Sequence, residues 1–428
     1  MKTAKIQTKK QVKNKEKMMY NKNIYFRLNK HKETFMQNFT YYTPTEIIFG
    51  KNTELQVGTL IKRYSGSKVM LVYGGGSIVR SGLLTRVEES LTNEGISFIH
   101  FGGVQPNPRL SFAEEGVKKA LEENVDFMLA VGGGSAIDTA KAIAHGVGNP
   151  NAKLWDLFMK KEPLGKSLPI GCVLTIAAAG SETSGSAVLN NEEIGRKDSL
   201  SSELNRPKFA IMNPELMFTL PKYQIACGVV DIMMHTLERY FIPEQKNQMT
   251  DEIAEALLRV TIENGRKAIE NPTDYDAMSE IMWCGSLSHN DITGLGRGAK
   301  DFSVHKFGHA LSMKYDYAHG ATLSAVWGAW AEYIYDADID RFAHYAKKVW
   351  GVENEDKEAA AREGIEKTVA FFKEINAPTN LRELGLETVS DEDLMELSMH
   401  ATQDGTTKLA VIKKLALEDV LQIFKNAR

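Results

Sequence analysis

The chain has 428 residues, of which 43% are hydrophobic and 25% charged, and its formal net charge is −3. This length exceeds one ordinary hydrophobic core, so two domains are expected. The balanced charge and the lack of an apolar run of about 20 residues argue against a nucleic-acid-binding or membrane-spanning protein. The three cysteines are scattered and form no CxxC pair, which predicts neither a disulfide framework nor a thiolate metal site and fits a reducing cytoplasm.

Residues 1–35 form a basic extension with ten lysines and one arginine against two glutamates. Such a run of like charge is typical of a solvated, disordered segment. It has neither the apolar core of a secretion signal nor the Arg-rich amphipathic pattern of a transit peptide. Met36 resembles a natural start, so the extension is expected to lie outside the folded domains.

Short apolar runs alternate with helical patterns after the extension. Helical spacing of apolar residues is seen at 83–91, 117–121 and 136–143. The alternation implies parallel pairing, so residues 36–217 are predicted to form a doubly wound α/β domain. The predicted strands are 45–49, 68–73, 96–101, 127–131, 169–175 and 208–212.

The pattern changes after Pro221. Apolar residues then recur at helical spacing almost to the end of the chain, with few strand candidates. The boundary is expected near residues 213–221, and residues 218–428 are predicted to form an all-α domain. No repeat or low-complexity linker separates the two domains, so close packing is expected.

Two predicted strands end in Gly-Gly-Gly-Ser, at 74–77 and 132–135, and a helical pattern follows each. Glycines there let an anionic ligand approach the backbone, where the next helix offers free N–H groups. A tight turn that needs glycine for positive φ explains each motif alone equally well, and neither motif is GxGxxG. Ser135 and Asp138 also fit a capping box. The two turns and a third at residues 180–183 together favour a phosphate-bearing cofactor.

Five potential metal ligands form two clusters. Asp231 and His235 are four residues apart in an apolar context, on one face of a predicted helix. His305 and His309 repeat this spacing, and His319 follows. Imidazoles with one carboxylate suit a borderline divalent metal, whereas a lone buried histidine is more often structural. One metal would not take all five groups, and spacing alone leaves open which histidine serves in proton transfer.

In this order, the motifs resemble the iron-dependent (group III) alcohol dehydrogenase family, in its butanol-dehydrogenase-like branch. The resemblance implies a Rossmann-like N-terminal domain and an all-α C-terminal domain, as in the dehydroquinate synthase-like architecture, with the active site between them. It also implies a homodimer. The match covers roughly residues 40–330 and rests on Phe49-Gly50-Lys51-Asn52, Pro106-Asn107-Pro108, the 132–141 motif, Gly180-Ser181-Glu182, the 228–238 motif, His305-x-x-x-His309 and His319-Gly320.

The resemblance implies a role for each of these site residues. It implies Fe²⁺, with Zn²⁺ as the alternative, held by Asp231, His235, His305 and His319. It implies proton relay for His309. Dinucleotide contacts are implied for Gly133, Gly134, Ser135 and Asp138 at the phosphates and for Thr175, and Gly75, Ser77 and Lys197 match positions near the adenosine ribose of NADP-preferring relatives.

The cofactor and substrate predictions follow from these positions. NAD-preferring enzymes place an acidic residue at the end of the second strand, and here that strand ends in Gly-Gly-Gly-Ser, which predicts NADP(H) over NAD(H). We expect an alcohol dehydrogenase or aldehyde reductase that acts on small primary alcohols and aldehydes, such as butanol and butyraldehyde, by direct hydride transfer.

Three alternatives share this fold. Glycerol dehydrogenase-like polyol oxidation and a dehydroquinate synthase-like lyase both fit the architecture, and the four-ligand Asp-His-His-His pattern argues against them. A non-enzymatic metal or nucleotide sensor is the third alternative, because a fold does not fix a function. The sequence shows no DNA-reading or partner-binding module of the kind that a sensor would need.

Overall fold

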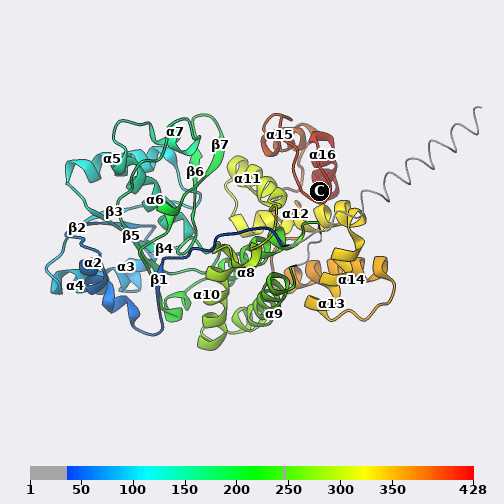
Figure 1. Cartoon of the computed structure of the whole chain (residues 1–428), viewed down its shortest axis with the longest axis horizontal. Coiled ribbons are helices and arrows are strands. Elements are labelled where there is room, and N and C mark those ends of the chain that lie inside the picture. The colour runs from blue at the N-terminus through cyan, green and yellow to red at the C-terminus, as the bar shows by residue number, and fades with distance from the viewer. Residues whose placement is uncertain (1–35, 244–246) are drawn as a thin grey trace, which may run out of the picture.

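The computed structural model describes residues 36–243 and 247–428, so the predicted basic extension lies outside the described residues. Within them the chain forms an α/β part and a helical part that lie side by side (Figure 1). The last strand, β8 (Phe209–Met212), ends ten residues before α8 (Lys222–Tyr240) begins. The predicted division at 217/218 falls in this interval, and its status as a domain boundary stays a prediction.

A six-stranded sheet forms the centre of the α/β part, in the order β1-β8-β5-β4-β2-β3. All of its neighbouring strands are parallel. Strands of a parallel sheet are buried on both faces, which is why these segments are nearly continuous apolar runs. The strands with β8 are β1 (Glu46–Phe49), β2 (Lys68–Tyr73), β3 (Ser97–Gly102), β4 (Phe127–Gly132) and β5 (Ile170–Leu174), each within one residue of its predicted bounds.

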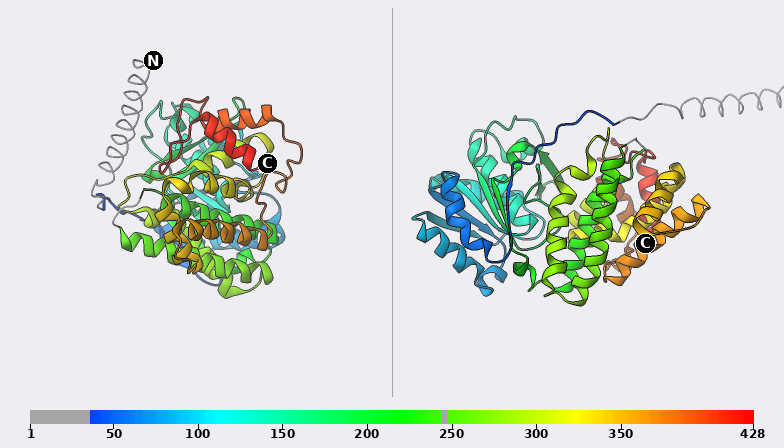
Figure 2. Two further views of the ribbon diagram at one scale, coloured as in Figure 1. Left: turned by 90° about the vertical axis from the view of Figure 1, so that its right-hand side faces the viewer. Right: turned by 60° about the horizontal axis from the view of Figure 1, so that its bottom comes forward.

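Helices cover both faces of this sheet, because successive side chains of a strand point to opposite faces (Figure 2). In β4, Phe127 and Leu129 belong to the core under α2 (Val57–Arg63) and α4 (Leu83–Asn93). Met128 and Ala130 belong to the core under α5 (Leu110–Glu122) and α6 (Gly134–Gly148). The predicted doubly wound α/β arrangement is confirmed.

The two glycine-rich turns follow neighbouring strands. Strand β2 lies between β3 and β4, with Tyr73 opposite Val131, and β4 in turn pairs with β5. The chain runs outward from β2 to β3 and then returns to the other side of β2, so the strand order reverses here. Ligands of parallel sheets bind at the carboxyl ends of strands beside such a reversal. The turns at 74–77 and 132–135, and Thr175 after β5, therefore share one edge of the sheet.

One element of the α/β part was not predicted. An antiparallel hairpin joins β6 (Ser186–Asn191) to β7 (Arg196–Ser201). Its polar and charged residues hide the alternation that a half-buried strand usually shows. The hairpin has a role in the site, because β7 brings Lys197 to the helical part. Two further α-helices of the α/β part are short, α3 (Ser77–Arg80) and α7 (Leu154–Phe158).

The helical part is built around α8, in which every residue from Ile225 to Tyr240 is buried. No strand lies beyond β8 in the described residues, as predicted. Within the same residues, no helix combines the length and apolar character that a membrane span requires. The other helices are α9 (Gln248–Glu270), α10 (Tyr275–His289), α11 (Ser303–Tyr315), α12 (His319–Ile334), α13 (Ile339–Trp350), α14 (Lys357–Glu374), α15 (Asp391–Ala401) and α16 (Leu417–Asn426).

Candidate metal and dinucleotide site

The predicted metal ligands meet in the helical part. Helix α8 carries Asp231 and His235 on one face, α11 carries His305, and α12 begins with His319. Asp231 Oδ1 lies 3.5 Å from Nε2 of His235, 3.7 Å from Nε2 of His305 and 3.8 Å from Nε2 of His319. The two Nε2 atoms of His235 and His305 are 3.3 Å apart. Three separate helices thus bring one oxygen and three nitrogens around a common point.

These donors fit a divalent metal. Four ligands bound at about 2.1 Å in tetrahedral geometry stand roughly 3.4 Å apart, close to the separations seen here. Asp231 Oδ1 is buried and has no hydrogen-bond partner in the described part of the chain. A buried carboxylate oxygen without a partner is costly, and a bound cation removes that cost. Asp231, His235 and His305 form a tight group of metal-binding side chains, with His319 slightly farther away.

Glu238 orients one of the histidines. It is fully buried on α8, and its carboxylate accepts hydrogen bonds from the His305 backbone N–H at 3.1 Å and from the ring Nδ1. With Nδ1 donating to Glu238, Nε2 faces the cluster and is the atom that would ligate a metal in place of its proton. Burial alone would lower the pKa of His305, but the carboxylates of Glu238 and Asp231 raise it to about 9. The site therefore favours positive charge at this point, as a metal site must.

Tight helix contacts fix the spacing of the ligands. A Cβ placed on Gly320 would lie 2.0 Å from the carbonyl oxygen of Cys227, so α12 touches the backbone of α8 beside His319. Gly228 makes the same kind of approach to the carbonyl oxygen of Ala177, which follows β5. Backbone contacts at both glycines thus hold α8 against α12 and against the edge of the sheet.

His309 lies beside the four-ligand cluster. Its ring centroid is 5.4 Å from that of His319 and 6.3 Å from that of His305. Its Nδ1 is buried and unpartnered within the described residues. Burial and the nearby cation Lys197 lower the pKa of His309, so the ring is neutral at physiological pH. A neutral imidazole can both accept and donate a proton, which suits the predicted relay role.

The second glycine-rich turn presents an open helix N-terminus. Helix α6 begins at Gly134, and no side chain caps it, so the capping-box interpretation of Ser135 and Asp138 is wrong. A Cβ at Gly133 would lie 2.1 Å from Ile176, whereas Gly134 faces open space. The free N–H groups of such a terminus bind anions. The predicted contacts of Gly133, Gly134 and Ser135 with dinucleotide phosphates stay a prediction.

Asp138 and Lys141 face the opposite way, into the protein. Asp138 accepts hydrogen bonds from Ser181 Oγ and, at 3.0 Å, from the Val188 backbone N–H. Lys141 is fully buried and donates to the carbonyl and hydroxyl oxygens of Ser181, both at 2.8 Å, and to the Ser186 carbonyl at 2.7 Å. The two residues hold the 180–186 turn onto α6. The predicted phosphate contact of Asp138 stays a prediction.

Lys197 joins the α/β part to the metal helices. Its ammonium donates to Asn107 Oδ1 at 3.0 Å and to Ser312 Oγ of α11 at 3.3 Å. Neither partner belongs to the turn that contains Gly75 and Ser77. Burial lowers the pKa of Lys197 to about 8, against the opposing effect of Asp138, Asp231 and Asp316. In this structure Lys197 lies beside the metal cluster.

The first glycine-rich turn is exposed and contains no acidic side chain. Gly75, Gly76 and Ser77 are exposed, and a Cβ on Gly75 would meet open space. The guanidinium of Arg80 lies over the turn, with Nη1 2.7 Å from a Cβ placed on Gly76. A hydroxyl and a cation therefore stand at the end of β2. Arg80 was not among the predicted cofactor residues.

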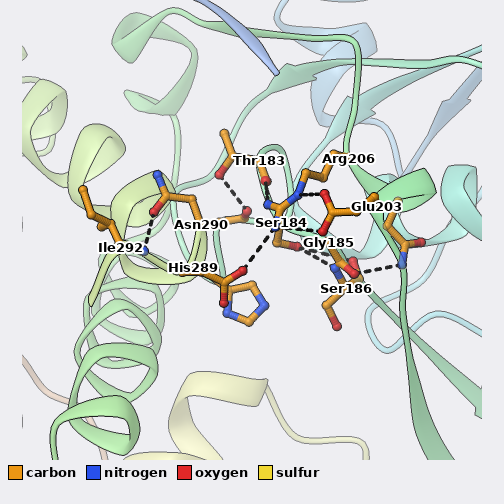
Figure 3. A network of polar contacts seen from close by, with 12 residues as sticks. Thr183, Ser184, Gly185, Ser186, Glu203, Arg206, His289, Asn290 and Ile292 are labelled. Carbon is orange, nitrogen blue, oxygen red and sulfur yellow. Dashed lines mark hydrogen bonds and ion pairs between the residues drawn. The ribbon is translucent and has the colours of Figure 1, made fainter. Parts of the chain in front are cut away.

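Arg206 ties the 180–186 turn to the helical part. It donates to the Thr183 carbonyl at 2.8 Å and forms ion pairs with Glu203 at 2.7 Å and with Asp291 at 3.1 Å (Figure 3). Asp291 lies just beyond α10 and has a φ of 78°, so it adopts the left-handed conformation. The bridge holds this turn against the loop that follows His289.

A fifth histidine, His289, stands at the metal cluster and was not predicted. Its ring centroid is 4.0 Å from that of His235, and Arg239 donates to its Nδ1 at 2.7 Å. Arg239 and Glu238 could have been found from spacing, because they follow His235 by four and three residues on the same helix. No sequence signal points to His289, which is isolated from the other histidines along the chain.

Comparisons with known proteins agree with this geometry. The family pattern described as "Iron-containing alcohol dehydrogenase" matches residues 44–214, and the pattern "Fe-containing alcohol dehydrogenase family, C-terminal" matches residues 225–428. The chain is 40% identical over 395 residues to NADH-dependent butanol dehydrogenase A of Clostridium acetobutylicum, covering 92% of this chain and 100% of the relative. It is 33% identical to the NADPH-dependent aldehyde reductase YqhD of Escherichia coli, with the same coverage.

A solved structure resembles the whole described fold. The crystal structure of NADH-dependent butanol dehydrogenase A from Thermotoga maritima superposes with a TM-score of 0.88 at 37% sequence identity. The match covers 92% of this chain and 100% of that one.

Proposed function

From the premise that this chain belongs to the iron-containing alcohol dehydrogenase family, we propose that it is a metal-dependent, NADP(H)-linked alcohol dehydrogenase and aldehyde reductase. Its substrates are small primary alcohols and aldehydes of the butanol and butyraldehyde type. That the chain is an alcohol oxidoreductase follows from the family. The metal dependence, the preferred dinucleotide and the substrate are proposals.

The observation that carries the proposal is the convergence of Asp231 Oδ1 with three histidine Nε2 atoms at 3.5–3.8 Å. We propose Fe²⁺ as the resident ion, with Zn²⁺ as the substitute that the same donors accept. When bound, such an ion polarises a carbonyl or stabilises an alkoxide, and a nicotinamide carries the hydride.

The chain's own side chains position the reactants and move the proton. Glu238 holds the His305 ring so that Nε2 faces the cluster. The open N-terminus of α6 binds the dinucleotide phosphates, and Thr175 stands at the next strand end. His309 is neutral and next to His319, so on oxidation it accepts the proton of the substrate hydroxyl, and on reduction the imidazolium so formed gives that proton back to the substrate oxygen.

The turn after β2 supports the choice of NADP(H). No carboxylate in this turn repels a 2′-phosphate, and Ser77 and Arg80 offer a hydroxyl and a guanidinium. The names of the relatives do not decide the matter, because two of those above are called NADH-dependent and one NADPH-dependent. Ser77→Glu tests the turn directly, and it is expected to lower kcat/KM for NADPH at least tenfold while affecting NADH less. An equal change with both dinucleotides would contradict the preference.

The function is tested with a panel of aldehydes from acetaldehyde to hexanal, NADH and NADPH, and protein loaded separately with iron or zinc. The expected result is dinucleotide oxidation that requires the metal and is fastest with NADPH. Loss of metal without loss of activity would overturn the metal dependence. Metal and dinucleotide binding without turnover of any aldehyde or alcohol would favour the sensor or the lyase instead.

The predicted homodimer also stays a proposal. Met36, Phe39, Tyr41 and Tyr42 are exposed along the segment that leads into β1, which is an edge strand. Exposed apolar side chains beside an unpaired strand edge suit a second copy of the chain. Light scattering of the purified protein measures the mass and decides the point.

A further inference from the structure

Arg239 is a buried cation beside the metal cluster that forms no ion pair with any residue the structure describes. The Arg239 side chain is almost fully buried, and within the described residues its Nε has no hydrogen-bond partner. Its two other nitrogens donate to neutral acceptors, the His235 carbonyl and Nδ1 of His289. A buried guanidinium that lacks a bonded carboxylate is expensive to keep. Because Arg239 donates to both His235 and His289, we infer that its role is to orient these two residues.

Arg239 determines which nitrogen of His289 carries the proton. A guanidinium can only donate, so Nδ1 of His289 must accept, and the proton of the neutral ring is on Nε2. Protonated Nε2 cannot ligate a metal, which sets His289 apart from His235, His305 and His319. The adjacent positive charge also polarises the ring and strengthens Nε2–H as a hydrogen-bond donor.

The His289 ring lies between the metal cluster and the 180–186 turn. It packs on the ring of His235 at 4.0 Å between centroids and is only partly buried. Its Cβ is 3.1 Å from a Cβ placed on Gly180, at the start of the turn that α6 holds. In Figure 3 the imidazole points away from the Arg206 ion pairs. Within the described residues Nε2 of His289 makes no hydrogen bond. It is also not one of the buried polar atoms that lack a partner, so this nitrogen is accessible.

We propose that His289, oriented by Arg239, donates a hydrogen bond to a second oxygen of the substrate. The preferred substrates then carry a hydroxyl or carbonyl oxygen next to the reacting carbon, as in 1,2-diols and 2-hydroxyaldehydes. The reacting oxygen belongs to the metal cluster, one ring away, and the second oxygen to His289. This inference rests on the proposed function and narrows its substrate class.

The test compares two alcohols of equal size, ethane-1,2-diol and propan-1-ol. The kcat/KM ratio of diol to alcohol is measured for the wild type and for His289→Phe and His289→Leu, two variants that lack the donor. The ratio is expected to fall about tenfold in both, the worth of one hydrogen bond. Electronic differences between the two alcohols cancel in this comparison. His289→Gln keeps an N–H donor and is expected to recover part of the ratio.

Two further measurements separate this inference from its premise. Calorimetric binding of the two alcohols to dinucleotide-loaded protein reports the preference without turnover, and the diol is expected to lose its advantage in both donorless variants. Metal content is measured in each variant, and His100→Leu, a substitution on the partly exposed strand β3, is the matched control. A wild type that turns over neither these two alcohols nor any aldehyde of the panel above refutes the proposed function, while binding still decides the role of His289. If His289→Phe retains its metal and its diol-to-alcohol kcat/KM ratio lies within twofold of the wild-type ratio, the inference is overturned.

Discussion

The side-chain amide of Asn107 donates a hydrogen bond to the carboxylate of Asp316 at 3.0 Å. Asn107 belongs to the loop after β3, and Asp316 ends α11, so the bond joins the α/β part to a metal-bearing helix. Both residues adopt the left-handed conformation, with φ values of 57° and 56°. Asn and Asp tolerate this conformation better than other residues that carry a Cβ, and alanine at either position would be strained. Lys197 bonds the same amide group, so three side chains fix this contact.

Two replacements of Asn107 should separate the contribution of its side-chain hydrogen bonds to stability from that of its backbone conformation. Asn107→Ala loses the bonds to Asp316 and Lys197 and keeps an unfavourable φ, so the free energy of unfolding is expected to fall by about 2–3 kcal/mol. Asn107→Gly loses the same bonds and relieves φ, so it is expected to lose less. Urea denaturation measures both values. A glycine variant less stable than the alanine variant would show that backbone strain is unimportant here.

The four-ligand assignment is tested by metal content. His305→Ala should abolish metal retention, because it removes one of the three ligand nitrogens, the Nε2 atom that lies 3.7 Å from Asp231 Oδ1. His309→Ala should retain the metal and slow turnover, because its ring lies outside the four-ligand group. Elemental analysis after dialysis, with kcat on the reloaded protein, distinguishes the two outcomes. Equal loss of metal in both variants would make His309 a ligand.

Glu238 is expected to control metal affinity without touching the metal. Glu238→Gln replaces the charged acceptor of the His305 ring by a neutral amide, which weakens the orientation and basicity of Nε2. Loss of such a supporting carboxylate typically costs 10–100-fold in metal affinity or activity. Competition with a chelating dye gives the affinity. Glu363→Gln, on the exposed face of α14, is the control. If the metal affinity of Glu238→Gln equals that of the wild type, Glu238 has a structural role only.

His145 should make stability depend on pH between about 4 and 6.5. Burial lowers its pKa to about 4, and its ring bonds Ser167 at 2.9 Å and Asn205 at 2.7 Å. In this window the unfolded chain binds a proton that the folded chain does not, so stability falls as the pH drops. The full effect of one group over this window is about 3 kcal/mol. His145→Gln should flatten the pH dependence of urea stability between pH 6.5 and 4, and an unchanged slope would assign the loss to other groups.

Much of the fold could be predicted because its signals are local. Buried parallel strands are continuous apolar runs, and the strand β4 with its glycine-rich end shows this plainly. The hairpin of β6 and β7 was missed, because residues such as Glu192 and Lys197 make it read as a polar loop. Its pairing depends on contacts with α6 and α11, which are distant in sequence.

The metal ligands were predictable for a different reason. Asp231 and His235 share one helix face, and His305 and His309 share another, so spacing brings each pair together. Spacing could not show that Asp138 turns toward Ser181 and leaves the α6 N-terminus uncapped. Nor could it place His289 against His235, because that contact joins α10 to α8 across the helical part.

The contact of Gly320 with Cys227 bears on how this protein can change over evolutionary time. Side chains beside the four ligands, such as His289, meet their neighbours through side-chain atoms, so a replacement there does not require a helix to move. The distance between α8 and α12 is fixed more firmly, because backbone atoms of α8 leave no room for a methyl group at residue 320. Libraries that aim at a new metal or a larger substrate should therefore leave residue 320 fixed and vary His289 or Phe302, whose ring centroid lies 5.3 Å from that of His305.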